Sequence, residues 1–202
     1  MGCLKEHDLK KYIDGYKINT FIETGTGVGD SLRYASSFNF ETLFSIEIVK
    51  ELYDELVFND ERITVCNTDS ISGLNKILST QVGSDGVVLF WLDAHLPGVD
   101  YHVDGYNPED RIDKAIKFPL EAELEQILSV REISMDVIII DDLRLYSDEA
   151  FLDTILENSM IEKWRQDYSL DSLFSTLEKI KKTHDVTTDT RDQGYLILTP
   201  KA

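Results

Sequence analysis

One stretch of the chain decides its fold: TFIETGTGVGD, residues 20–30. A short apolar run ends at Glu23 and is followed by glycines at alternate positions, Gly25, Gly27 and Gly29. Glycine allows the backbone to turn tightly and a ligand to approach it closely, and a helix that follows points its N-terminus at that ligand. The stretch therefore predicts a buried strand, a ligand-binding turn and the start of a helix.

Short apolar runs alternate with amphipathic periods along the rest of the chain. We expect strands at residues 20–23, 43–47, 63–67, 87–93, 137–141 and 195–199, and helices at 49–57, 71–78, 119–128 and 169–180. Strands that are apolar on both faces and alternate with helices indicate a parallel sheet covered on both sides. The expected fold class is a doubly wound α/β sandwich, organised as one domain over residues 1–202.

The irregular stretch 96–118 is too long for a plain connection in such a domain. Two glycines and two tyrosines stand there among charged residues. We interpret it as a lid that closes over substrate, with a disordered acidic loop as the alternative.

Carboxylates stand where the first five predicted strands end. They are Glu23, Glu47, Asp69, Asp93 with His95 close behind, and Asp141 with Asp142. In open α/β sheets, ligands bind outside the carboxyl ends of the strands. One such residue would be an ordinary helix cap, but five in succession predict a binding site along this edge of the sheet.

The composition narrows the classes of partner. The 202 residues include 38 acidic and 20 basic side chains, for a net charge of −18. Such a surface repels phosphodiester backbones and anionic headgroups, so we expect no nucleic-acid or membrane partner and instead a small-molecule acceptor. Two cysteines without disulfide or metal spacing, and no apolar run of signal or membrane-spanning length, predict a cytoplasmic protein. The oligomeric state stays open, a homodimer included.

The pattern E-x-G-x-G-x-G, from Glu23 to Gly29, resembles motif I of class I S-adenosylmethionine-dependent methyltransferases. A dinucleotide fingerprint would need a third glycine where Asp30 stands. The resemblance extends over residues 21–198, and it implies a Rossmann-like, mostly parallel seven-stranded sheet in a three-layer αβα sandwich, with S-adenosylmethionine as cofactor. It assigns these residues of the turn to cofactor binding: Glu23, Thr24, Gly25, Gly27, Gly29, Asp30 and Ser31.

Three further positions fit the same cofactor. An acidic residue about 20 positions beyond a glycine loop binds ribose hydroxyls in nucleotide-binding folds, and Glu47 stands there; a solvated strand end is the alternative. The segment containing Asp69 and Ser70 is similar to the methyltransferase segment whose aspartate contacts adenine, although either residue would also cap the next helix. Asp93 is expected to contact the cofactor as well.

The resemblance also suggests a metal. In metal-dependent O-methyltransferases of the catechol and macrolide-sugar types, an acid after the fourth strand pairs with Asp-Asp or Asp-Asn after the fifth. Asp93, Asp141 and Asp142 match this pattern. Clustered carboxylates repel one another unless a cation joins them, and hard oxygen ligands suit Mg²⁺ or Mn²⁺. Alternatively, Asp141 and Asp142 point to opposite sides of the strand, and Asp93 serves the cofactor alone.

His95, with Asp93, is the predicted catalytic residue. An attacking hydroxyl must lose its proton, and an imidazole that titrates near neutral pH can take it; a structural histidine is the alternative. The motifs FWLDAH and VIIIDDLR are similar to those of bacterial methyltransferase-like proteins associated with surface-glycan or secondary-metabolite clusters. We therefore expect O-methylation of a small polar acceptor, such as a sugar hydroxyl. The alternatives are a nicotinamide-dependent oxidoreductase and a catalytically silent cofactor-binding or interaction protein.

Overall fold

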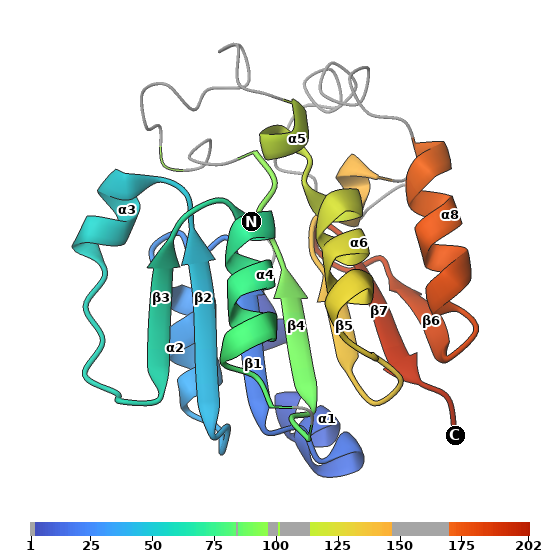
Figure 1. The fold of residues 1–202 in the computed structure, drawn as a ribbon, viewed down its shortest axis with the longest axis horizontal. Coiled ribbons are helices and arrows are strands. Elements are labelled where there is room, and N and C mark those ends of the chain that lie inside the picture. Colours follow the sequence, from blue (N-terminus) through green and yellow to red (C-terminus); the bar gives the residue numbers. More distant parts are fainter. Residues whose placement is uncertain (1–2, 84, 97–100, 102–113, 147–169) are drawn as a thin grey trace.

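The strands of the computed structural model form a seven-stranded sheet in the order β3-β2-β1-β4-β5-β7-β6 (Figure 1). The structure describes residues 3–83, 85–96, 101, 114–146 and 170–202. The strands are β1 Thr20–Thr24, β2 Thr42–Glu47, β3 Ile63–Asn67, β4 Val88–Leu92, β5 Val137–Ile140, β6 His184–Asp189 and β7 Tyr195–Pro200. Neighbours among β1 to β5 pair in parallel, whereas β7 runs antiparallel to both β5 and β6. The predicted doubly wound, mostly parallel sheet is confirmed.

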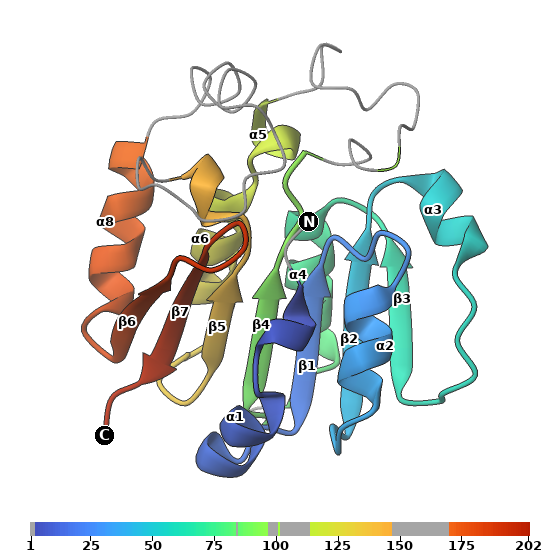
Figure 2. The same ribbon diagram turned by 180° about the vertical axis from the view of Figure 1, so that it is seen from behind.

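Helices cover both faces of this sheet. They are η1 Leu4–Glu6, α1 Leu9–Tyr16, α2 Asp30–Ser36, α3 Lys50–Glu55, α4 Ser70–Thr80, α5 Lys114–Lys117, α6 Leu120–Val130, η3 Leu143–Leu145 and α8 Leu170–Ile180. Figure 1 shows α4, α6 and α8 in front of the sheet, and Figure 2 shows α1 and α2 on the opposite face. The fold is therefore the expected three-layer αβα sandwich.

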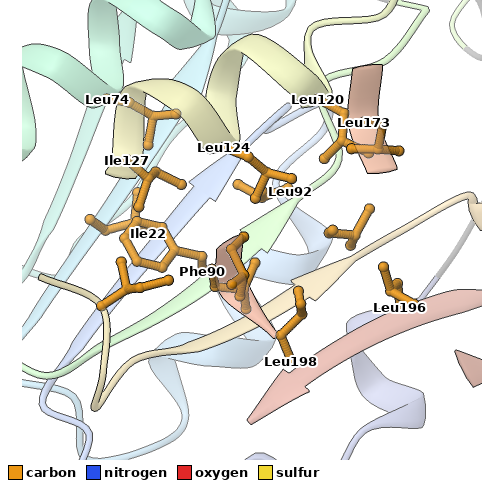
Figure 3. Packing of buried hydrophobic residues seen from close by; sticks show 14 of the residues in the cluster. Ile22, Leu74, Phe90, Leu92, Leu120, Leu124, Ile127, Leu173, Leu196 and Leu198 are labelled. Carbon is orange, nitrogen blue, oxygen red and sulfur yellow. The ribbon is translucent and has the colours of Figure 1, made fainter. Parts of the chain in front are cut away.

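Alternating strand residues supply the two cores. Side chains along a strand point to opposite faces, so in β4 the side chain of Phe90 packs under α4, α6 and α8, while that of Trp91 packs on the other side. Figure 3 shows Phe90, Leu124 and Leu198 among the side chains of the first core. Where both faces are buried, as in β4 and β5, the strand is a continuous apolar run, which made it recognisable in the sequence.

The register of the sheet brings the functional segments together. Thr24 at the end of β1 is paired with Ile46 of β2 on one side and with Leu92 of β4 on the other. The chain order reverses between β1 and β4, and such a reversal is where ligands bind in open α/β sheets. The glycine turn after β1 therefore lies directly beside the segment that follows β4.

Some expectations require correction or stay untested. The helix expected over 49–57 is shorter, Lys50–Glu55, and Val57 is 70% exposed instead of facing a core. Most of the expected lid, 96–118, and the expected helix start at Ser169 lie outside the described residues. Among the helices that the structure describes, none is long and apolar enough to cross a membrane.

Candidate cofactor and active site

A cavity of about 220 Å³ opens at the carboxyl edge of the sheet, where β1, β2, β3 and β4 end. Its described lining residues are Gly25, Gly27, Ile46–Ile48, Leu52, Thr68–Ile71, Asp93–Leu96, Tyr101, Ala115, Ile116, Pro119 and Asp142. All five strand ends at which carboxylates were noted contribute residues to the lining, and four of them contribute a carboxylate: Glu47, Asp69, Asp93 and Asp142. The predicted binding edge and this cavity coincide.

The glycine turn is shaped by close neighbours. Gly25 has a φ of +81° and Gly27 a φ of +53°, a region that costs residues with a Cβ about 1–2 kcal/mol. A Cβ on Gly25 would lie 2.3 Å from the carbonyl oxygen of Asp93, and one on Gly27 would lie 2.3 Å from the Tyr101 hydroxyl. Gly25 is therefore required both for conformation and for space, since its neighbours are backbone atoms, whereas at Gly27 the conformation favours glycine and the Tyr101 ring would have to move.

Glu47 is held at the end of β2 by the turn itself. Its side chain is 4% exposed; Oε2 accepts a hydrogen bond from the Gly27 N–H at 2.7 Å, and Oε1 accepts one from the Val49 N–H at 2.7 Å. Burial raises the pKa of Glu47, and these backbone donors oppose that shift. A solvated strand end is therefore wrong for Glu47. Since each carboxylate oxygen has two lone pairs, both retain acceptor capacity toward a ligand in the cavity.

The end of β3 contributes a helix cap that also lines the cavity. Asp69 accepts a hydrogen bond from the Ser72 N–H at 2.8 Å and so caps α4, while Asp69 and Ser70 both border the cavity. This segment therefore caps a helix and is also placed to contact a ligand in the cavity. Leu52 and Ile71, which lie in the predicted helices 49–57 and 71–78, add apolar lining that sequence reasoning missed.

Two other predicted cofactor residues, Glu23 and Thr24, are buried next to the turn and form hydrogen bonds within the protein. Glu23 is fully buried, and its Oε2 accepts a hydrogen bond from Ser45 Oγ at 2.6 Å. Burial, together with nearby Glu47, raises the pKa of Glu23 to about 8 against the opposing effect of the Ser45 bond. Thr24 Oγ1 accepts from the Asp93 N–H at 3.3 Å.

The start of α2 is separate from the cavity. Gly29, Asp30 and Ser31 are not among its described lining residues. The Asp30 side chain is 75% exposed and lies 3.6 Å from Arg33. The structure therefore leaves the assignment of these three residues to the cofactor as a prediction without a contact to support it.

His95 and Asp93 lie together on the cavity lining. His95 Nε2 is 3.5 Å from Asp93 Oδ1 and makes a close hydrogen bond with Asp142 Oδ2. Burial raises the pKa of Asp93 well above its usual range, and the neighbouring Asp141 and Asp142 raise it further. The structure thus groups the predicted base with two carboxyl groups, one after its own strand and one after β5.

The predicted metal triad is not assembled. Asp141 is fully buried away from the cavity, and its Oδ1 accepts a hydrogen bond from the Asp142 N–H at 2.6 Å. Asp142 lines the cavity, but Oδ2 bonds His95 and Oδ1 lies 2.8 Å from Arg144 Nε. Among the described residues, no group of three His, Cys, Asp or Glu side chains is placed to hold a metal ion. These residues therefore do not fit Mg²⁺ or Mn²⁺ as predicted.

The two neighbouring aspartates differ in pKa. Burial and the proximity of Asp142 raise the pKa of Asp141 to about 8. Burial also acts to raise the pKa of Asp142, but His95 and Arg144 outweigh it and hold that pKa below its usual value. The alternative in which adjacent aspartates take opposite sides is the one that the structure supports.

Glu123 is a buried carboxyl near the site that sequence reasoning missed. It lies in the first turn of α6, is 1% exposed, and hydrogen-bonds the hydroxyls of Ser70 and Thr24. Burial raises its pKa to about 7, although these two bonds lower it. Only its neighbours in space show that it links α6 to β1 and α4.

The strand order, the glycine turn after β1 and the acidic residue ending β2 define a Rossmann-like methyltransferase fold. Comparison of the sequence with protein-family models and with curated proteins finds no match. Comparison with solved structures finds similar folds in methyltransferases.

Three of these structures were solved with S-adenosylhomocysteine (SAH) bound. The Podospora anserina methyltransferase PaMTH1 is 14% identical, with a TM-score of 0.58 over 96% of this chain and 76% of that chain. The Bacillus cereus O-methyltransferase is 12% identical, with a TM-score of 0.58 over 100% of this chain and 82% of that chain. Human methyltransferase-like protein 13 is 10% identical, with a TM-score of 0.53 over 96% and 77%. At these identities the likeness establishes the fold.

Proposed function

We propose that the protein is an S-adenosylmethionine-dependent methyltransferase whose cofactor occupies the cavity at the ends of β1 to β4. The observation that carries the proposal is Glu47, buried beside the glycine turn and bonded to the Gly27 N–H at 2.7 Å. Its carboxylate suits a pair of ribose hydroxyls. Leu52 and Ile71 offer apolar contacts to an adenine ring, and Asp69 and Ser70 offer polar ones.

The charge of the cavity supports a cationic methyl donor. Its described lining includes the acidic residues Glu47, Asp69, Asp93 and Asp142, and no Lys or Arg among the residues placed by the structure. A sulfonium and an ammonium group are favoured by carboxylates in a partly buried site, where charges interact more strongly than in water. The SAH-bound methyltransferases of similar fold support the same cofactor.

The acceptor end of the proposal is O-methylation of a small polar molecule, such as a sugar hydroxyl. The cofactor supplies an activated methyl group, so the protein has mainly to align donor and acceptor. The acceptor oxygen would attack the methyl carbon as the carbon–sulfur bond breaks, and His95 would take the hydroxyl proton. The proposed reaction uses no metal ion, because both oxygens of Asp142 are paired, one with His95 and the other with Arg144.

A binding panel tests the cofactor. Purified protein is titrated calorimetrically with SAH, S-adenosylmethionine, NAD and NADP, and its thermal unfolding is followed with each. SAH at 100 times its dissociation constant should add about 2.7 kcal/mol to the free energy of unfolding, which is a rise in Tm of roughly 5–11 °C at about 2–4 °C per kcal/mol. Tight NAD or NADP binding without SAH binding would favour the oxidoreductase. Binding of none of the four would favour an interaction protein.

A further inference from the structure

Arg144 lies beside Asp142, one of the three aspartates that were expected to hold a divalent cation. It belongs to η3, directly after β5, and its side chain is 4% exposed. Its Nε is 2.8 Å from Asp142 Oδ1. The guanidinium of Arg144 therefore places a positive charge beside the carboxyl group of Asp142.

The backbone at Asp142 arranges this contact. Asp142 has φ 51° and ψ 46°, the left-handed region, which aspartate tolerates better than most residues. The preceding Asp141 remains fully buried, while Asp142 reaches the cavity. The turn therefore separates two adjacent carboxyl groups and aims one of them at both Arg144 and His95.

Asp142 also determines how His95 is held. Its Oδ2 bonds His95 Nε2, and its other oxygen faces Arg144. A neutral imidazole that donates from Nε2 to a carboxylate carries its lone pair on Nδ1. To coordinate a metal ion, Asp142 would have to give up one or both of these partners, and Arg144 would be left buried without this carboxylate.

We propose that Arg144 takes the place of a divalent cation in this cluster: it neutralises Asp142, and Asp142 in turn positions His95 with its proton on Nε2. Arg144 and Asp142 are then positioning residues, and the cluster works without a metal. The consequence for methyl transfer, that Nδ1 of His95 receives the acceptor's proton, rests on the proposed function. The arrangement of Arg144, Asp142 and His95 does not depend on that function.

Metal binding tests the first part of the proposal, that Arg144 takes the place of a divalent cation. Mn²⁺ is titrated into the full chain at pH 7.5, and the free ion is followed by electron paramagnetic resonance. The wild type should show no one-to-one site tighter than about 1 mM, whereas Arg144→Met should bind Mn²⁺ at least tenfold more tightly, because its carboxylates have lost their counter-charge. Arg144→Lys keeps the charge and should behave as the wild type. A tight wild-type site that disappears in Asp142→Asn would overturn the proposal, as would a folded Arg144→Met protein without the gain.

The tautomer of His95 tests the second part of the proposal, that Asp142 positions this ring. The experiment does not require any Arg144 variant to fold. ¹⁵N-histidine-labelled protein is examined by NMR at pH 7.5, with the His95 signals identified from a His95→Gln sample. Wild-type His95 should be protonated on Nε2, and Asp142→Asn should abolish this fixed tautomer. Asp141→Asn is the matched control, since Asp141 lies next in the chain yet bonds the backbone of Asp142 instead of His95, and it should leave the His95 proton on Nε2.

Protonation of His95 on Nδ1 in the wild type, or signals that do not depend on Asp142, would overturn the positioning role. SAH binding is measured on the same samples. A protein that fails to bind SAH but shows the Asp142-dependent tautomer would defeat the proposed function and leave this inference standing. The reverse result, SAH binding with an Asp142-independent tautomer, would defeat the inference alone.

Discussion

Glu47 tests the cofactor site with one side chain. Replacing it by glutamine keeps the shape and one carbonyl acceptor but removes the negative charge and one acceptor oxygen. Hydrogen bonds to charged groups contribute about 1.5–3 kcal/mol, so Glu47→Gln should weaken SAH binding by about tenfold to a hundredfold in calorimetry. Glu51→Gln, on the exposed side of α3, is the control and should bind as the wild type. Equal affinity in both variants would place the ribose elsewhere.

His7 makes a separate prediction about pH and stability. It is buried beside Tyr195, with ring centroids 4.5 Å apart, and beside Trp91 at 5.7 Å. Burial lowers its pKa from 6.5 to about 4, with Arg191 acting in the same direction and Asp189 against it. The folded protein therefore keeps this ring neutral at pH values where the unfolded chain protonates it.

This difference in protonation should make the folded protein less stable as the pH falls. Between pH 6.5 and about 4 the unfolded state binds a proton that the folded state does not, so His7 should cost up to about 3 kcal/mol of unfolding free energy over this interval. His7→Phe, which keeps a ring in the cluster, should lose correspondingly less stability on acidification. Urea unfolding at pH 7 and pH 4.5 measures both proteins. Parallel losses in the two would show that His7 does not contribute to acid sensitivity.

At the scale of the element, α4 packs on β2 through a glycine. A Cβ on Gly73 would lie 2.7–2.9 Å from three side-chain carbons of Ile46, a residue that lines the cavity. Gly15 in α1 has nothing within 4 Å of the same position. Alanine favours a helix over glycine by about 0.5–1 kcal/mol, so the two sites offer the same chemical change with opposite surroundings.

Gly15→Ala should therefore stabilise the protein by roughly 0.5 kcal/mol. Gly73→Ala should destabilise it by about 1–3 kcal/mol because overpacking outweighs the helix preference, and it should weaken SAH binding through the displaced Ile46. Chemical unfolding and calorimetry measure the two effects. A Gly73→Ala protein as stable as Gly15→Ala would mean that Ile46 changes rotamer without cost.

Elements with strong patterns could be predicted from the sequence. Apolar runs marked β1 to β5 and β7, and they are continuous in β4 and β5, which are buried on both faces. The edge strand β6, HDVTTD, escaped because Val186 is its single aliphatic side chain and its burial is partial. The helix after β2 was predicted too long, since Val57 continues the apolar spacing although the chain leaves the helix at Leu56.

Residues of the site could be predicted where they stand at the carboxyl end of a strand, because ligands bind there in open α/β sheets. That rule found Glu47, Asp69, Asp93 and Asp142, all on the cavity lining. It could not find Arg144 or Glu123, because their roles depend on where side chains point after a turn or across a helix. The metal hypothesis failed for the same reason: adjacency in sequence brought carboxylates to one edge but did not reveal that Asp142 pairs with Arg144 and His95.

At the scale of the whole molecule, charge is the dominant surface property. The chain carries 38 acidic and 20 basic residues, a net charge of −18, and self-repulsion at such a charge destabilises the compact state. Exposed ion pairs such as Lys10–Asp14 and Lys50–Asp54 oppose it only weakly, because water and salt screen them. Better buried pairs, Arg131–Asp136 and Arg144–Asp142, are screened much less by salt.

Added salt should therefore stabilise this protein. Raising NaCl from 10 mM to 150 mM shortens the screening length from about 30 Å to about 8 Å, which weakens long-range repulsion more than short contacts. We expect Tm at pH 7.5 to rise by roughly 2–4 °C for each kcal/mol of repulsion removed, and KCl to act like NaCl. Near the isoelectric point, about pH 4.5, the net charge vanishes and so should the salt effect. A Tm that falls with salt at pH 7.5 would mean that attractive surface pairs outweigh the excess negative charge.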